Sequence, residues 1–344
     1  MITAHEPRYR LSQNMFRQTK VIIDRSGAGQ YVNDCHEESK GTGGRKSAGI
    51  NYTIDAVLVC ALSLIMLGRT PTLKAILNAI GDLSPAQLAE VGMSGQDTGR
   101  IFSTPAEQHR ERQRFIAWLQ RRLQPLDPSP DQPARRITNA EHRRIIAQRG
   151  PSEVAKYAAA GQRLRTVINL LIKGSISDPQ PPGAVGDLVA DESIYDLAGP
   201  RPGLGVRPDT KRGAAYCGTY YAREKNSGPM RDGDYRNGKH AFGLGLTAIT
   251  RIGAGNQLHA VAPVMVAADI HGPTSGNVDA LKECIEHMQH NGLDTRPPGA
   301  ASWPRFIVDM GYSPKKSFPS LMFDKRYTAV FRYPEGTTLT EPSG

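Results

Sequence analysis

The stretch RFIVDMGYSP, residues Arg305–Pro314, runs from an apolar segment straight into one carboxylate, Asp309. A glycine and a tyrosine follow almost at once, which is typical of a strand that ends in a turn. A second apolar run, VADES, also meets an acid, Asp191. Side chains at strand ends can leave the core while the backbone stays fixed, so we expect both acids at one edge of a β-sheet.

These two aspartates lie far apart in the sequence, yet they converge if their strands are neighbours. Two carboxylates a few ångströms apart repel each other unless a cation separates them. Mg²⁺ takes one or two protein carboxylates and fills its other positions with water and phosphate oxygens, so such a pair suits a phosphodiester substrate. The alternative is that each aspartate initiates a turn by bonding to its own backbone.

The C-terminal half has the pattern of a mixed sheet. Short apolar runs bounded by turn residues predict strands, and one amphipathic run predicts a helix. Strands in close succession favour antiparallel pairing, whereas the helix supplies the crossover that a parallel strand requires. The expected order is three strands at 186–194, 240–252 and 257–270, a helix at 275–292, and two strands at 305–313 and 327–333.

The N-terminal half is predicted to be helical. Thr53, Thr72 and Ser84 each stand before a run with helical periodicity, where a hydroxyl can cap the helix. These three short helices are either a helix-turn-helix unit or plain helical packing. A longer amphipathic helix at 104–123 carries arginines that either face solvent or contact phosphate: Arg110, Arg112, Arg114, Arg121 and Arg122.

Composition divides the chain into three parts. Residues 1–50 mix basic and small residues without steady periodicity, which predicts a basic, partly ordered arm. Residues 51–178 are expected to form a helical domain for DNA binding or dimerisation, and residues 185–344 a sheet domain. The predicted fold class is α+β, with an all-α N-terminal region followed by a mixed β-sheet flanked by helices.

The chain of 344 residues has 43 Lys and Arg against 33 Asp and Glu, a formal charge of +10. This balance favours polyanionic partners, although an Arg-rich composition alone also produces it. The four cysteines form no CxxC pair, so neither a zinc ribbon nor a disulfide framework is indicated. The most apolar stretch, 54–67, is too short to span a bilayer, and we expect a cytoplasmic protein with no membrane partner.

Four stretches occur in the order and rough spacing seen in a known family: VADESIYDL, YRNGKHAFGLGLTAIT, PVMVAADIHGPTSGNVDALKECI and RFIVDMGYSP. They resemble bacterial insertion-sequence transposases of the DDE type, whose catalytic core is RNase H-like. In the resemblance, Asp191-Glu192-Ser193 matches the first acidic stretch of the family, and the stretch from Asp309 to Tyr312 matches the second. The helical N-terminal half resembles the long leader of actinobacterial members.

The resemblance implies that Asp191 and Asp309 are catalytic and bind metal, with two Mg²⁺ or Mn²⁺ ions in the intact family site. The third acid of the family, a glutamate, lies on a helix after the fifth strand. Only PEGTTLTEPSG follows the last expected strand here, and neither Glu335 nor Glu341 lies on a plausible helix. We therefore expect an RNase H-like core that is C-terminally incomplete, and whether this chain is itself an enzyme stays open.

The implied function is that of a DNA transposase, with metal-dependent phosphodiester hydrolysis and strand transfer at transposon ends. The implied partners are double-stranded DNA and a second copy of the chain in a homodimer, at the nucleoid. Basic residues are expected to bind DNA phosphate: Arg231, Lys239, Lys315 and Lys316. Two alternatives stay open, a truncated DNA-binding or regulatory remnant without catalysis and another metal-dependent class such as a phosphatase.

Overall fold

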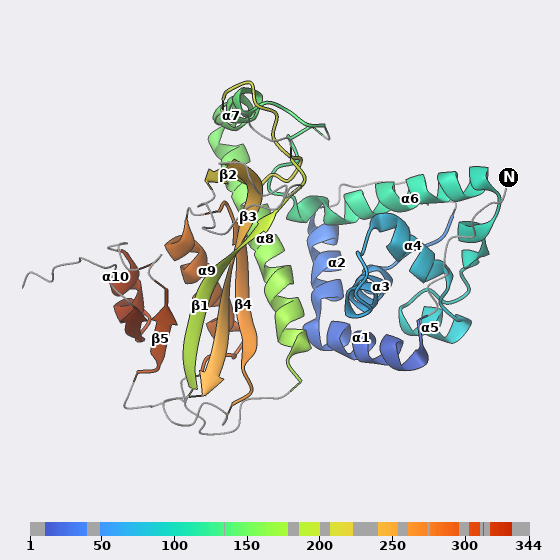
Figure 1. The fold of residues 1–344 in the computed structure, drawn as a ribbon. Coiled ribbons are helices and arrows are strands. Elements are labelled where there is room, and N and C mark those ends of the chain that lie inside the picture. Colours follow the sequence, from blue (N-terminus) through green and yellow to red (C-terminus); the bar gives the residue numbers. More distant parts are fainter. Residues whose placement is uncertain are drawn as a thin grey trace, which may run out of the picture. The chain divides into compact units, whose positions relative to one another are not determined.

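Two compact units make up the protein (Figure 1). The computed structural model describes residues 11–39, 49–133, 135–177, 186–199, 207–222, 240–253, 261–273, 276–295, 303–309, 312 and 317–331. Unit 1 comprises Met1–Asp127 and Ala159–Ser175, and unit 2 comprises Pro128–Ala158 and Ile176–Gly344. The helix α8 (Pro151–Ser175) therefore contributes residues to both units.

The described part of unit 1 is helical. Hydroxyl caps set where its helices begin, because the side chains of Thr53, Thr72 and Ser84 accept hydrogen bonds from backbone N–H groups of the first turn. All three predicted helix starts are thus confirmed. The helices are α1 (Gln13–Ser26), α2 (Ala28–Glu38), α3 (Ile54–Met66), α4 (Leu73–Gly81), α5 (Pro85–Glu90), η1 (Thr98–Phe102), α6 (Pro105–Leu123), η2 (Gln124–Leu126) and the closing part of α8.

The predicted N-terminal arm needs correction, because its described residues include the helices α1 and α2. Ser12 caps α1, and Gly27, with a left-handed φ of 65°, separates the two helices. Phe16 and Ile23 of α1 are buried in the core of unit 1. The buried positions of α1 recur at intervals of three and four residues behind the Ser12 cap, so the signal for this helix was present in the sequence.

One mixed sheet of six strands forms the centre of unit 2. The strands are β1 (Gly186–Asp196), β2 (Thr219–Ala222), β3 (His240–Gly253), β4 (Val264–His271), β5 (Arg305–Val308) and β6 (Thr328–Phe331). Their order is β2-β3-β1-β5-β6, and β4 also pairs with β3. β3 is antiparallel to β1, β2 and β4, whereas β5 is parallel to both β1 and β6. The α+β class with a mixed sheet is confirmed.

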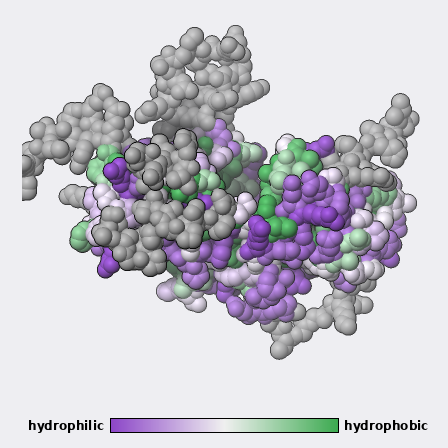
Figure 2. Space-filling view, turned by 90° about the horizontal axis from the view of Figure 1, so that it is seen from below, coloured by the Kyte–Doolittle hydropathy of each residue, from purple (hydrophilic) through white to green (hydrophobic). Residues whose placement is uncertain are grey.

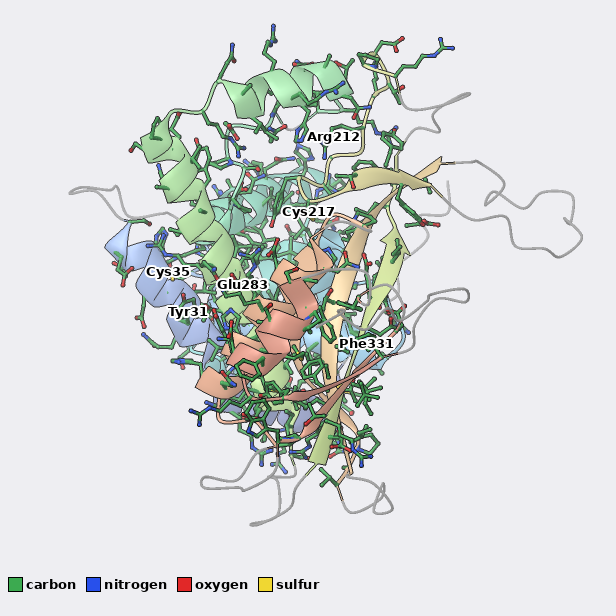
Figure 3. All side chains as sticks on the ribbon, turned by 90° about the vertical axis from the view of Figure 1, so that its left-hand side faces the viewer. Tyr31, Cys35, Arg212, Cys217, Glu283 and Phe331 are labelled. Atoms are coloured by element: carbon green, nitrogen blue, oxygen red, sulfur yellow. The ribbon has the colours of Figure 1, made fainter. Side chains whose placement is uncertain are left out.

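Two helices of unit 2, α9 (Asn277–His290) and α10 (Ser317–Asp324), share a hydrophobic core with the sheet. α9 follows β4 and precedes β5, so it lies in the crossover that leads to the parallel strands. Figure 3 shows α9, marked by Glu283, and β6, marked by Phe331, on the same side of unit 2. A further helix, α7 (Asn139–Ala147), precedes α8 in this unit.

The pairing of β5 with β1 is fixed by buried side chains. Apolar residues of both strands, Ala190 and Val308 among them, lie in the core beneath α9. At an alternate position of β1, the buried carboxylate of Asp187 accepts a hydrogen bond of 2.9 Å from the backbone N–H of Arg305. This bond attaches the first residue of β5 to β1, and so it helps to set the register of the parallel pair.

Some strand boundaries differ from the predicted ones. β1 continues to Asp196, two residues past its predicted end, because β3 supplies antiparallel partners as far as Gly243. Asp191 is paired with Ala248 and so lies within the strand, which corrects the expectation that it stands at a strand end. The third predicted strand begins later than expected, at Val264. β2 and α10 have no counterpart among the predicted elements, since each is too short to carry a clear apolar period.

The described residues include no helix that is both long enough and apolar enough to cross a membrane. On the face shown in Figure 2, hydrophilic residues predominate and apolar residues form smaller patches between them. The large apolar side chains that remain exposed include Ile65, Met66 and Phe323.

Replacing Asp187 by alanine should lower the free energy of unfolding of unit 2 by about 1–3 kcal/mol, because the N–H of Arg305 would lose its acceptor in a buried setting. Asp187→Asn keeps an amide oxygen and should cost less. Urea denaturation measures the difference, with the exposed Asp324→Ala as the control. Equal stability of the Asp187→Ala and Asp324→Ala variants would show that the bond does not hold β5.

Candidate functional site

The parallel register sets Asp191 beside Asp309. The last paired residues of the two strands are Ala190 and Val308, and each aspartate is the next residue along its strand. Neighbouring strands lie about 4.8 Å apart, and partners in a parallel pair present their side chains on the same face of the sheet. Both aspartates are exposed. The paired part of the two strands therefore ends one residue before both acids singled out in the sequence, and we call Asp191 and Asp309 the carboxylate pair.

Local hydrogen bonds also involve these aspartates. One oxygen of the Asp191 carboxylate accepts the backbone N–H of Glu192 at 2.8 Å. The backbone carbonyl of Asp309 accepts the N–H of Tyr312 at 3.4 Å, which closes a turn after β5. Turn formation at Asp309 thus uses its backbone oxygen.

Glu192 lies on the other face of the sheet, since successive side chains of a strand alternate. Its Oε2 accepts a hydrogen bond of 2.6 Å from Nδ2 of Asn277, the first residue of α9. Its Oε1 lies against Gly245, where an added Cβ would come within 2.5 Å of that oxygen. Gly245 therefore leaves room for the glutamate side chain in its present position, and Glu192 connects α9 to the strand that carries Asp191.

Tyr312 belongs to the core that the sheet shares with α9 and α10, and it is only 1% exposed. Burial raises its pKa to about 12, and the negative charge of Glu192 adds to the rise. The charges of Asp309 and Asp191 raise the pKa further, although proximity to the hydroxyl of Thr247 partly offsets the increase. Tyr312 consequently stays protonated at neutral pH, as a neutral group close to three carboxylates.

A polar pair on the antiparallel strands completes this part of the sheet. The hydroxyl of Thr247 on β3 and Nε2 of His271 on β4 are 2.8 Å apart. Thr247 is the cross-strand partner of Glu192, so its side chain lies on the α9 face. Five residues therefore lie on the face of the sheet opposite the carboxylate pair, and we call them the supporting cluster: Glu192, Thr247, His271, Asn277 and Tyr312.

The carboxylate pair fits a hard divalent cation. Two exposed carboxylates at equivalent positions offer oxygen donors, which suit Mg²⁺ and Mn²⁺, and leave the remaining coordination positions to water or to a phosphate. Within the described ranges, no three His, Cys, Asp or Glu side chains form a group that could hold a metal ion. The pair would therefore supply only part of a ligand set.

The basic residues expected to bind DNA phosphate, Arg231, Lys239, Lys315 and Lys316, lie outside the described residues. A nearby basic residue that the structure does describe, Arg212, is labelled in Figure 3 and is 4% exposed. Its guanidinium donates to the carbonyl oxygens of Tyr216 and Gly218 and lies over the Phe242 ring at 5.6 Å. Arg212 is thus an interior residue of unit 2.

Sequence reasoning did not assign roles to Glu192, Asn277 or Tyr312. All three stand within the stretches that carry the resemblance: Glu192 directly follows Asp191, and Tyr312 lies three residues after Asp309. Their positions offered a signal, but the contact between Glu192 and Asn277 depends on the three-dimensional placement of α9. Comparison of the chain with protein-family models, curated proteins and solved structures found no match.

Neutralising either member of the carboxylate pair should stabilise the metal-free protein. Two unit charges about 5 Å apart in water repel by about 1 kcal/mol, so Asp191→Asn or Asp309→Asn should raise the free energy of unfolding by up to that amount in EDTA. The double variant should gain little beyond either single variant, because the repulsion is lost only once.

Denaturation of the four proteins in EDTA measures this coupling, with the exposed Asp279→Asn as the matched control. Strictly additive effects of the two substitutions would mean that the carboxylates do not sense each other. Saturating Mg²⁺ should stabilise the unsubstituted chain more than either single variant, since binding to the native state is linked to its stability.

Proposed function

We propose that the chain is a DNA transposase of the DDE type and that unit 2 is its RNase H-like core. The observation that supports it most is the parallel register of β1 and β5, whose last paired residues, Ala190 and Val308, immediately precede Asp191 and Asp309. The connectivity supports the assignment: antiparallel strands come first, a helix follows, and two parallel strands complete the sheet. The resemblance of four ordered stretches gives the pair its proposed role in phosphodiester chemistry.

The residues of the chain have separate tasks in this proposal. Asp191 and Asp309 would hold divalent ions at the exposed edge, where a phosphodiester can approach. When bound, such ions polarise phosphate oxygens and lower the pKa of coordinated water. The supporting cluster holds the backbone that carries the acids, because Glu192 is hydrogen-bonded to α9 while Tyr312 is buried in the core and neutral.

The described residues supply two of the three acids that the resemblance implies, and this limits the metal binding and catalysis that they can support. With two carboxylates, the pair can bind an ion more weakly than a complete site would, and the geometry of in-line displacement is less constrained. A chain that binds DNA without cutting it is therefore the second candidate, favoured by the small ligand set among the described residues. Transposon ends, a homodimer and a location at the nucleoid follow from the resemblance and stay predictions.

Nicking of supercoiled plasmid by the purified full chain tests the proposal. Conversion to the open circle should require Mg²⁺ or Mn²⁺ and should fall by on the order of 100-fold in Asp191→Asn and Asp309→Asn. Asp279→Asn, which removes an exposed carboxylate from the first turn of α9, should leave the rate unchanged.

The outcomes separate the two candidates. Metal-dependent nicking that survives both substitutions would remove the carboxylate pair from the mechanism. Retarded migration of plasmid without nicking, under conditions in which the variants also bind, would favour the DNA-binding remnant. Neither binding nor nicking would overturn both assignments.

A further inference from the structure

A groove in unit 1 is lined by residues that have no role in the proposed chemistry of the carboxylate pair. It has a volume of about 440 Å³ and lies between α6 and the segment 49–52. This volume falls in the range of sites that hold small organic ligands. The side chains that matter for its chemistry are Tyr52, Glu111, Arg114, Trp118, Arg121 and Arg122.

The spacing of residues along α6 builds one wall of this groove. Arg114, Trp118 and Arg121 recur at intervals of four and three residues, so their side chains leave the helix on the same face. The adjacent stripe of α6, which includes Phe115 and Leu119, is buried in the core of unit 1. The amphipathic helix predicted from the sequence therefore presents an arginine–tryptophan stripe beside its buried face.

The tryptophan is held by other aromatic rings. The ring of Trp118 lies 5.6 Å from that of Tyr52 and 6.2 Å from that of Phe115, measured between centroids. Phe115 is fully buried, whereas Trp118 is only partly buried and lines the groove. A large aromatic ring that packs against other rings and also lines a groove is suited to stacking against a flat ligand.

A buried acid orients one of the arginines. Glu111 is 2% exposed, accepts a hydrogen bond of 2.7 Å from the hydroxyl of Tyr52, and forms an ion pair of 3.3 Å with Arg114. Burial and the bond to Glu111 raise the pKa of Tyr52, so its hydroxyl remains a donor. The Arg114 side chain is nevertheless 51% exposed, which leaves donors directed at solvent.

The other two arginines leave positive charge at the groove. Nη1 of Arg122 forms an ion pair of 3.5 Å with Oε1 of Glu37, whose side chain is 56% exposed. Arg121 is exposed and makes no hydrogen bond or ion pair to another residue in the part of the chain that the structure describes. Three guanidinium groups against two carboxylates leave a net positive charge, with Arg121 available to a ligand.

We propose that this groove binds a single-stranded nucleic-acid segment, with one base stacked on Trp118 and flanking phosphates held by Arg114 and Arg121. Seven residues of helix place the two arginines about 10 Å apart along α6, on either side of the tryptophan. Base stacking on an aromatic ring within a basic groove is the usual mode of single-strand binding. In a duplex the bases are already stacked and cannot reach Trp118.

An acidic peptide is the less suitable ligand, because it would use the arginines and leave the aromatic wall without a partner. The proposal does not depend on the catalytic assignment of unit 2, since every residue that carries it belongs to unit 1. The sequence left open whether the five α6 arginines face solvent or contact phosphate. The proposal gives phosphate contact to two of them, Arg114 and Arg121.

Fluorescence anisotropy of a labelled oligonucleotide with the full chain in EDTA tests the proposal without nicking. Single strands should bind more tightly than the same sequence as a duplex. Trp118→Ala should weaken single-strand binding by roughly 5- to 150-fold, the cost of losing one stacked base. Arg121→Ala should reduce the slope of log affinity against log salt by about 0.7, as expected for one phosphate contact on a single strand.

Arg112→Ala is the matched control, since it removes the same charge from α6 at a position outside the groove. Its affinity and salt slope should remain close to those of the unsubstituted chain. Trp118→Phe, which keeps an aromatic ring, should retain most of the binding. This variant tests stacking even if Trp118→Ala fails to fold.

Three results would overturn the proposal. Equal effects of Arg112→Ala and Arg121→Ala on affinity and salt slope would show that the arginines contribute only through the overall positive charge of the protein. Tighter binding of the duplex, unaffected by Trp118→Ala in a protein that remains folded, would exclude stacking. Competition by an acidic peptide as strong as that by the unlabelled single strand would show that the groove selects charge alone.

Discussion

The parallel pairing of β5 with β1 is the constraint on which the candidate site depends. The two strands are joined through buried apolar residues on one face and through the bond from Arg305 N–H to Asp187. Parallel partners keep the same direction, so the residues that follow Ala190 and Val308 continue at the same level and on the same face of the sheet. A shift of one residue in this register would send Asp309 to the face opposite Asp191.

Strand alternation then separates two kinds of chemistry across the sheet. The carboxylate pair lies on the exposed side, where repulsion makes it receptive to a cation. The supporting cluster lies on the α9 side, where Glu192 is bonded to Asn277 and Tyr312 is buried and neutral. This division allows the acids to remain accessible while the backbone that carries them is held by packed helices.

The sequence predicted the elements whose signals are local. Hydroxyl caps at Thr53, Thr72 and Ser84 and the apolar runs around Leu188 and Phe306 needed no tertiary information. The last two residues of β1, beyond the predicted end at 194, were missed because they are exposed and pair with β3, which is distant in the sequence. The division of α8 between two units was missed as well, since one uninterrupted helix crosses the boundary.

An engineered disulfide between positions 191 and 309 measures the central claim most directly. Neighbouring parallel positions have Cα atoms roughly 5 Å apart, within the reach of a disulfide. Asp191→Cys with Asp309→Cys should cross-link readily under mild oxidation, as identified by peptide mass spectrometry, whereas Ser193→Cys with Asp309→Cys should not, because position 193 lies two residues further along β1. Failure of the first pair to cross-link in the folded protein, or equal cross-linking of both pairs, would contradict the register and the site built on it.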